Sequence, residues 1–131
     1  MEEKLIDMMS LENGLTLEFY DTSRRIAGDR WQVSVVARIE VDVKPEYFKG
    51  QKGANAFIDD IRGAAGKTTT YRHEKTRNFI AEDEKDKVFK ELKERFLEAN
   101  LKYLSSPDFA RKLILKRYQE AHGRSLSWKG Q

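Results

Sequence analysis

Gly66, Lys67 and Thr68 match the second half of a phosphate-binding loop. In a P-loop, G-x-x-x-x-G-K-[ST], backbone N–H groups surround the phosphates and the lysine reaches the outer ones. The first glycine is missing, because Ile61 occupies its position. Apolar residues recur at helical spacing before these glycines, and a Thr-rich, aromatic segment follows them. This predicts the order helix–loop–strand, whereas a P-loop follows a strand and opens a helix. We therefore interpret the glycines as a helix end.

The segment TTTYRHEKTRNF, residues 68–79, mixes cations with aromatic side chains. Cations hold phosphates and aromatic rings stack bases, so a strand of this composition suits a nucleic acid. Alternate residues of a strand share a face. One face is then formed by Tyr71, His73, Lys75, Arg77 and Phe79, and the other by Arg72, Glu74, Thr76 and Asn78. The candidate polyanion-binding residues are Arg62, Lys67, Tyr71, Arg72, His73, Lys75 and Arg77. The competing interpretation is a solvated edge strand whose charges discourage unwanted pairing.

Other chemistries find little support in the sequence. The chain has no cysteine, which excludes disulfides, thiolate metal sites and cysteine nucleophiles. Its two histidines, His73 and His122, have no ligand partner at a recognised metal-binding spacing. His122 suits the last turn of a helix, where a cation interacts favourably with the helix dipole. No nucleophile motif is present. We expect no catalytic residue, no metal and no cofactor.

Composition indicates one domain over residues 1–131, because 131 residues is an ordinary domain size. The net charge of +3 is unevenly spread. Residues 62–80 carry five basic and one acidic side chain, and residues 105–131 carry six basic and two acidic. Two basic segments are a weak indication of a polyanionic partner. The acidic N-terminus and the lack of a long apolar run predict a soluble, cytoplasmic protein without a membrane segment.

The first half of the sequence is typical of strands. We expect strands at residues 4–11, 15–24 and 31–43, with a tight turn at Glu12-Asn13-Gly14. Residues 31–43 alternate most clearly: Trp31, Val33, Val35, Ala37, Ile39, Val41 and Val43 form a buried face. The opposite face should be wet, with Val36 as its exception and Tyr20 beside it. Residues 68–80 form a fourth strand, at an edge of the sheet.

The second half is typical of helices. A short helix is expected within residues 49–66. A second runs from about Asp83 to Leu104, its inner stripe formed by Phe89, Leu92, Phe96, Ala99 and Tyr103 and widened by Val88, Leu97, Leu101 and Leu104. A third helix has Ser106 as its N-cap, Phe109, Ala110, Leu113, Ile114, Tyr118 and Ala121 facing inward, and its end at Gly123. The predicted fold is α+β: a four-stranded, mainly antiparallel sheet with a C-terminal helical hairpin packed on one face.

Three hypotheses follow for function. The first is a non-enzymatic protein-interaction module whose partner is another protein or a second copy, since an edge strand offers free backbone groups. The alternative is a nucleic-acid-binding protein that uses residues 62–79. The third is an enzyme or small-molecule binder with a pocket between sheet and helices. Trp128, in the C-terminal segment, either covers the sheet edge or anchors a partner.

Overall fold

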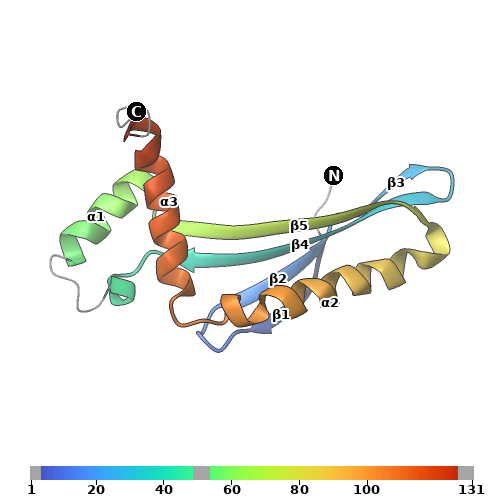
Figure 1. Cartoon of the computed structure of the whole chain (residues 1–131), viewed down its shortest axis with the longest axis horizontal. Coiled ribbons are helices and arrows are strands. Elements are labelled where there is room, and N and C mark those ends of the chain that lie inside the picture. The colour runs from blue at the N-terminus through green and yellow to red at the C-terminus, as the bar shows by residue number, and fades with distance from the viewer. Residues whose placement is uncertain (1–3, 49–53, 127–131) are drawn as a thin grey trace. The chain divides into compact units, whose positions relative to one another are not determined.

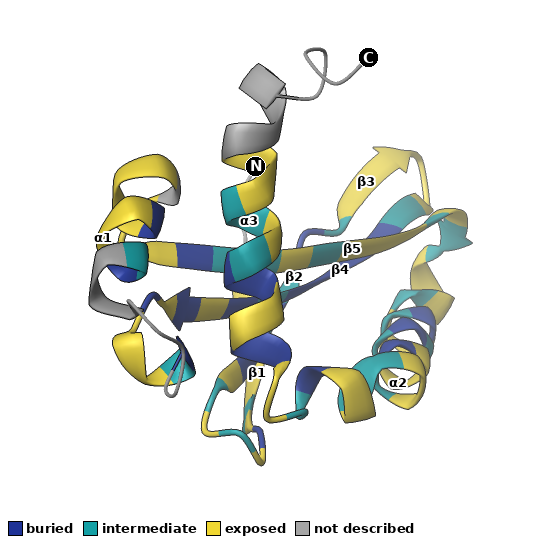
Figure 2. Cartoon of the chain, turned by 60° about the vertical axis from the view of Figure 1, so that its left-hand side comes forward, coloured by how far each residue is buried: buried dark blue, intermediate teal, exposed yellow. Residues whose placement is uncertain are grey.

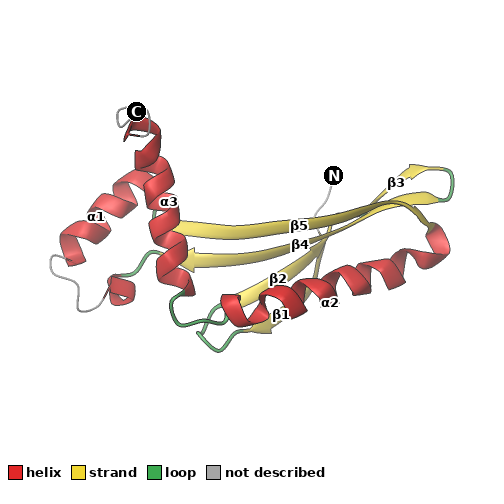
Figure 3. Ribbon diagram, in the orientation of Figure 1, coloured by secondary structure: helices red, strands yellow, loops and turns green. Residues whose placement is uncertain are grey.

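The chain forms a five-stranded sheet and three α-helices. The computed structural model describes residues 4–48 and 54–126 (Figure 1). The strands are β1 (Lys4–Ser10), β2 (Thr16–Asp21), β3 (Arg24–Ala27), β4 (Arg30–Asp42) and β5 (Thr68–Ala81). The helices are the short η1 (Pro45–Phe48) and η2 (Glu82–Glu84), with α1 (Ala54–Ala65), α2 (Lys85–Leu104) and α3 (Phe109–Leu126) (Figure 3). This arrangement confirms the predicted α+β class, but the sheet has five strands where four were predicted, because β3 is a separate strand.

The chain divides into two compact units. Unit 1 comprises residues 1–39 and 72–106, and unit 2 comprises residues 40–71 and 107–131. Unit 1 contains β1 to β3, most of β4 and β5, and α2. Unit 2 contains the end of β4, the start of β5, α1 and α3. The two long strands therefore belong to both units.

The sheet has β4 at its centre. β1 pairs antiparallel with β2, and both β2 and β3 pair antiparallel with β4. Because β2 meets Val35–Arg38 and β3 meets Arg30–Gln32, these two strands follow one edge of β4. β5 takes the other edge. Among the described strands, β1, β3 and β5 thus have one neighbour each.

The predicted turn between the first two strands is present. The Gly14 N–H donates to the Leu11 carbonyl at 2.9 Å, and Gly14 has a φ of 87°. A left-handed glycine closing a three-residue loop is a common hairpin connection. Asn13 fixes this loop against the end of α2, because its side-chain amide donates to the carbonyls of Leu104 at 2.8 Å and Ser106 at 2.9 Å.

The core of unit 1 lies between β4, β2 and α2. The predicted inner face of β4 is confirmed at Val33, Val35, Ala37 and Ile39, which are at most 2% exposed (Figure 2). It is wrong at Trp31, which is only half-buried. Phe96 of α2 packs edge-on against Phe19 of β2, with ring centroids 6.0 Å apart. The buried residues of α2 are Val88, Leu92, Phe96 and Leu104. The predicted stripe was wrong at two positions, because Ala99 and Tyr103 are exposed.

The second face of β4 is less wet than its polar residues predict. Ser34 is 2% exposed and Val36 is fully buried. The Ser34 hydroxyl bonds the Glu74 carboxylate at 2.9 Å and the Thr76 hydroxyl at 3.1 Å. These two bonds satisfy the buried Ser34 hydroxyl within the sheet.

In unit 2, α1 ends where the glycines predict an end. Gly66 has a φ of 94°, and its N–H donates to the Arg62 carbonyl at 3.0 Å. A left-handed glycine after the last helical residue is a frequent helix stop. β5 then begins at Thr68, so the order is helix–loop–strand and Gly66-Lys67-Thr68 does not form a P-loop.

The bounds of α3 differ from those predicted. The helix begins at Phe109, so Ser106 and Pro107 precede it, and it passes Gly123 to reach Leu126. Its inner face is confirmed at Phe109, Ala110, Leu113 and Ile114, which are all buried, but Ala121 is exposed. α3 packs on the start of β5 through Phe109, whose ring meets Tyr71 with centroids 5.7 Å apart. Trp128 and the His122 side chain lie outside the described residues.

Candidate functional site: a basic groove between β5 and α2

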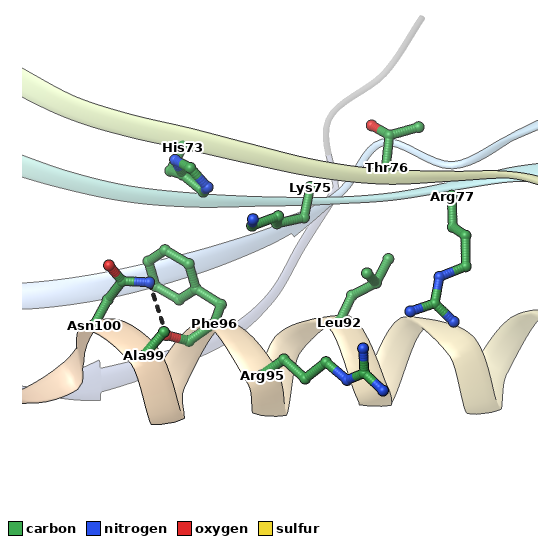
Figure 4. Close-up of a pocket in the computed structure, with 9 residues that line it drawn as sticks. All are labelled: His73, Lys75, Thr76, Arg77, Leu92, Arg95, Phe96, Ala99 and Asn100. Atoms are coloured by element: carbon green, nitrogen blue, oxygen red, sulfur yellow. Dashed lines mark hydrogen bonds between the residues drawn. The ribbon is translucent and has the colours of Figure 1, made fainter.

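The side chains of β5 alternate as predicted over its central residues. His73, Lys75 and Arg77 point toward α2, and Thr76 points away from it (Figure 4). Glu74 and Thr76 bond Ser34 on the opposite face of the sheet. The alternation stops at Phe79, which was predicted to share the face of Arg77. Phe79 has a φ of 58° and is 70% exposed, so it leaves the regular strand conformation.

A groove lies between this face of β5 and α2, entirely within unit 1. Its volume is about 560 Å³. It is lined by His73, Lys75, Thr76 and Arg77 of β5 and by Leu92, Arg95, Phe96, Ala99 and Asn100 of α2. The helical contributors lie three or four residues apart, as neighbours on one helix face must. One wall is therefore a strand and the other a single face of a helix.

The charge of the groove is positive. Lys75, Arg77 and Arg95 contribute three cations, and none of the nine lining residues is acidic. Arg77 is partly neutralised by Glu91, with a nitrogen–oxygen distance of 3.8 Å. Within the described part of the chain, Lys75 and Arg95 form neither a hydrogen bond nor an ion pair. These two cations, one on each wall, can therefore interact with an external anion without first breaking an internal contact.

His73 belongs to the groove but adds no charge to it. Its ring lies against Phe96, with centroids 5.5 Å apart and planes inclined by 31°. Burial lowers the pKa of His73 below its ordinary value of 6.5, and the nearby Lys75 ammonium lowers this pKa further. The imidazole is thus neutral at pH 7. Its Nε2 is buried and has no hydrogen-bond partner among the described residues.

The predicted polyanion-binding residues are divided between the two units. Arg62, Lys67 and Tyr71 belong to unit 2, and Arg72, His73, Lys75 and Arg77 to unit 1. Arg62 supports the fold, because its guanidinium donates to the Val43 carbonyl at 2.7 Å. Tyr71 packs on Phe109, which occupies its ring. Arg72 alternates with His73 and so lies on the face away from the groove.

Sequence reasoning missed the helical half of the site. Arg95 and Asn100 were absent from the candidate residues, because α2 was interpreted only as a packing element. A signal was present, however. Leu92, Arg95, Phe96, Ala99 and Asn100 follow the spacing of one helix face, and two of them are polar where a core-facing stripe would be apolar.

The described residues form neither a metal site nor a membrane-spanning helix. In residues 4–48 and 54–126, no three His, Asp or Glu side chains are grouped so that they could hold a metal ion. None of the helices in that part of the chain is long and apolar enough to cross a membrane. The groove between β5 and α2 is therefore the candidate site. Comparison of the chain with family models, with curated proteins and with solved structures found no match.

Proposed function

We propose that the chain is a protein-interaction module that binds an extended, acidic peptide along β5. One observation carries this proposal: two unpaired cations, Lys75 and Arg95, line a groove that lies directly beside an edge strand. An edge strand supplies main-chain hydrogen bonds to an added strand, and pockets beside it select the side chains of that strand.

The backbone of β5 favours this mode of binding. The Lys67 carbonyl accepts a hydrogen bond from the Val43 N–H at 2.9 Å, so the odd-numbered residues at the start of β5 face β4. The Arg117 guanidinium reaches the Thr70 carbonyl, which is consistent with even-numbered residues facing outward. By strand alternation, the N–H and C=O groups of Glu74 and Thr76 are then available to an added strand.

The groove determines which side chains of the bound peptide are selected. Every second residue of an added strand faces the same side of the sheet as Lys75 and Arg77. Acidic residues at positions i and i+2 of the peptide would lie beside Lys75 and Arg95. Each exposed charge pair contributes about 0.2–1 kcal/mol, so two such residues give selectivity rather than tight binding.

Nucleic acid is the alternative ligand, because the same cations can hold phosphates. The aromatic residue of the groove does not favour it: Phe96 is 2% exposed and presents no ring face on which a base could stack. Binding is also favoured over catalysis. None of the lining residues is a carboxylate or a serine, so the groove lacks the paired carboxylates and the serine nucleophile of common hydrolytic sites.

The proposal is tested by fluorescence anisotropy with three labelled probes. These are a peptide with glutamate at alternate positions, the same peptide with glutamine there, and single-stranded oligothymidine. We expect the glutamate peptide to bind and the glutamine peptide to bind about tenfold more weakly. Oligothymidine binding as tightly as the glutamate peptide would favour the nucleic-acid function instead. Loss of discrimination between the two peptides would overturn the role of the cations.

Three variants localise the binding. Lys75→Gln/Arg95→Gln should weaken the glutamate peptide by about tenfold, whereas Lys87→Gln/Lys90→Gln, with the same charge change on α2 outside the groove, should not. Thr76→Pro removes one outward N–H of the edge strand, a position where proline is tolerated. Thr76→Pro should weaken binding of the glutamate peptide and leave binding of oligothymidine unchanged. Equal effects of both double variants would mean that binding depends on overall charge rather than on the groove.

A further inference from the structure

A second edge strand, β1, presents an apolar surface. Leu5, Ile6 and Met8 are 44%, 41% and 55% exposed. They account for half of the six large apolar side chains that are exposed in the described part of the chain. An exposed edge strand of this composition is a template for pairing with another strand. β1 differs in this from β5, whose exposed edge is mostly polar.

The backbone of β1 shows which groups point outward. The Leu11 N–H donates to the Leu15 carbonyl at 2.8 Å, and from there the register runs through Met9↔Leu17 and Asp7↔Phe19 to Lys4↔Asp21. These residues therefore direct their backbone groups at β2. The alternate residues, Leu5 and Met8, direct theirs to the open edge. Ile6 is the extra residue of a bulge between Leu5 and Asp7.

The bulge also places the two charged side chains of β1 on the same face of the sheet. Lys4 and Asp7 lie opposite Asp21 and Phe19, which are two residues apart in β2 and so share a face. Leu5 and Met8 lie opposite Tyr20 and Glu18, on the other face. Lys4 and Asp7 are the strand's charged residues, one of each sign.

We infer that β1 pairs antiparallel with β1 of a second copy of the chain, about a two-fold axis at Leu5. In this register the two Leu5 residues exchange backbone hydrogen bonds and their side chains meet on one face. Because Ile6 is the extra residue of the bulge, the next residue after Leu5 in the regular pairing is Asp7. On the other face, Lys4 of each copy therefore lies beside Asp7 of the other copy. The strand is thus complementary to itself in backbone, apolar contact and charge, as a two-fold interface requires.

Two competing pairings fit less well. An axis at Met8 also matches the outward backbone groups, but it places the Asp7 carboxylate opposite Met9 and pairs no charges. Self-pairing of β5 would bring Lys75 and Arg77 of two copies together, and like charges across a strand pair are destabilising. The two edges are therefore suited to different partners.

Sedimentation equilibrium over a concentration series tests the inference. We expect a monomer–dimer equilibrium for the wild type and a monomer for Leu5→Lys. Ile26→Lys is the matched control, because Ile26 is 37% exposed but lies on β3, and it should still dimerise. A wild type that stays monomeric up to about 1 mM, or a Leu5→Lys variant that dimerises unchanged, would overturn the inference.

A charge exchange tests the register itself. In Lys4→Glu each dimer would contain two acid–acid pairs, and in Asp7→Lys two base–base pairs, so each variant alone should dimerise at least about tenfold more weakly than the wild type. An equimolar mixture restores both opposite-charge pairs, and we expect heterodimers with nearly wild-type affinity. Asp7→Lys also loses its internal contact with Lys93 in the mixture, so recovery there reports the contact between copies. A mixture that remains monomeric overturns the axis at Leu5.

Discussion

Two of the edge strands, β1 and β5, have the same backbone capacity and opposite side-chain chemistry. Both pair with one described neighbour. β1 exposes leucine, isoleucine and methionine with one balanced pair of charges, whereas β5 carries unpaired cations beside a helix. The backbone of an edge strand offers the same hydrogen bonds to any partner, so the side chains must decide which partner is accepted. The comparison therefore predicts self-association at β1 and capture of an acidic segment at β5.

The largest difference between the two edges should appear in stability. Phe96 supports the β5 side through its contacts with Phe19 and His73 and is 2% exposed, so Phe96→Ala should lower the free energy of unfolding by about 3–5 kcal/mol. Leu5→Ala on β1 should change it by less than about 0.5 kcal/mol, because Leu5 is already half exposed. Urea denaturation at low protein concentration measures both. A loss of similar size in the two variants would contradict the view of β1 as an exterior strand.

Salt should separate the two binding modes. Raising NaCl from about 50 mM to about 500 mM shortens the screening length several-fold. We expect this to weaken the glutamate peptide at β5 by about tenfold, and to change β1 self-association by less than about threefold, since apolar contact contributes to it. Anisotropy and sedimentation in the same buffers give both values. A peptide affinity that is insensitive to salt would argue against Lys75 and Arg95 as its contacts.

A smaller effect should come from Glu91, which competes with an acidic peptide for Arg77. Glu91 neutralises part of Arg77, so Glu91→Gln should raise the affinity for the glutamate peptide by about two- to threefold. For the same reason, Arg77→Gln should cost less affinity than Lys75→Gln. β1 self-association should be unchanged in all three variants, which serves as the internal control. Weaker peptide binding in Glu91→Gln would indicate that Glu91 positions Arg77 rather than competing for it.

The smallest expected effect is a pH dependence that differs between the two sides. The pKa of His73 is lowered in the folded protein, chiefly by burial, so the unfolded chain takes up this proton first as the pH falls. His73 therefore contributes stability that is complete above about pH 6.5 and is lost as the pH falls through the folded-state pKa. The bond from Lys93 lowers the pKa of Asp7 below 3.8, so the contribution of Asp7 is lost only in more acidic solution.

Chemical denaturation at pH 7.5 and pH 5.5 tests this assignment. The wild type should be less stable at the lower pH, and His73→Gln should show a smaller difference between the two. Asp7→Asn should keep the wild-type difference, because Asp7 stays ionised over that range. A His73→Gln variant with the full wild-type pH dependence would assign the effect to another group.

The strands of the sheet could be predicted from the sequence because their pattern is local. A period of two along Trp31–Val43 and along Thr68–Arg77 already fixes which side chains share a face. The turn at Gly14 and the helix end at Gly66 were also local, since each needs a positive φ that glycine adopts readily. The division of β5 into a face with His73 and a face with Glu74 followed from the same period.

The helical wall of the groove could not be predicted in the same way. Successive residues of a helix are 100° apart, so a broad apolar face admits several orientations. The orientation of α2 is decided by contacts distant in sequence, such as Phe96 with Phe19 and Lys93 with Asp7. These contacts bury Val88 and leave Tyr103 outside, and they place Arg95 and Asn100 in the lining of the groove. Tertiary contacts of α2, and not its local sequence pattern, therefore determine the helical wall of the site.

The interleaving of the two units has a consequence for synthesis of the chain. Unit 1 needs residues 1–39 and 72–106, and the segment between them belongs to unit 2. During translation, Leu17 and Phe19 emerge long before α2, which packs on this side of the sheet. A nascent hairpin with its apolar face uncovered is open to chaperones and to wrong partners until residue 106 has left the ribosome. Unit 1 can then close, and unit 2 is completed last, when α3 emerges.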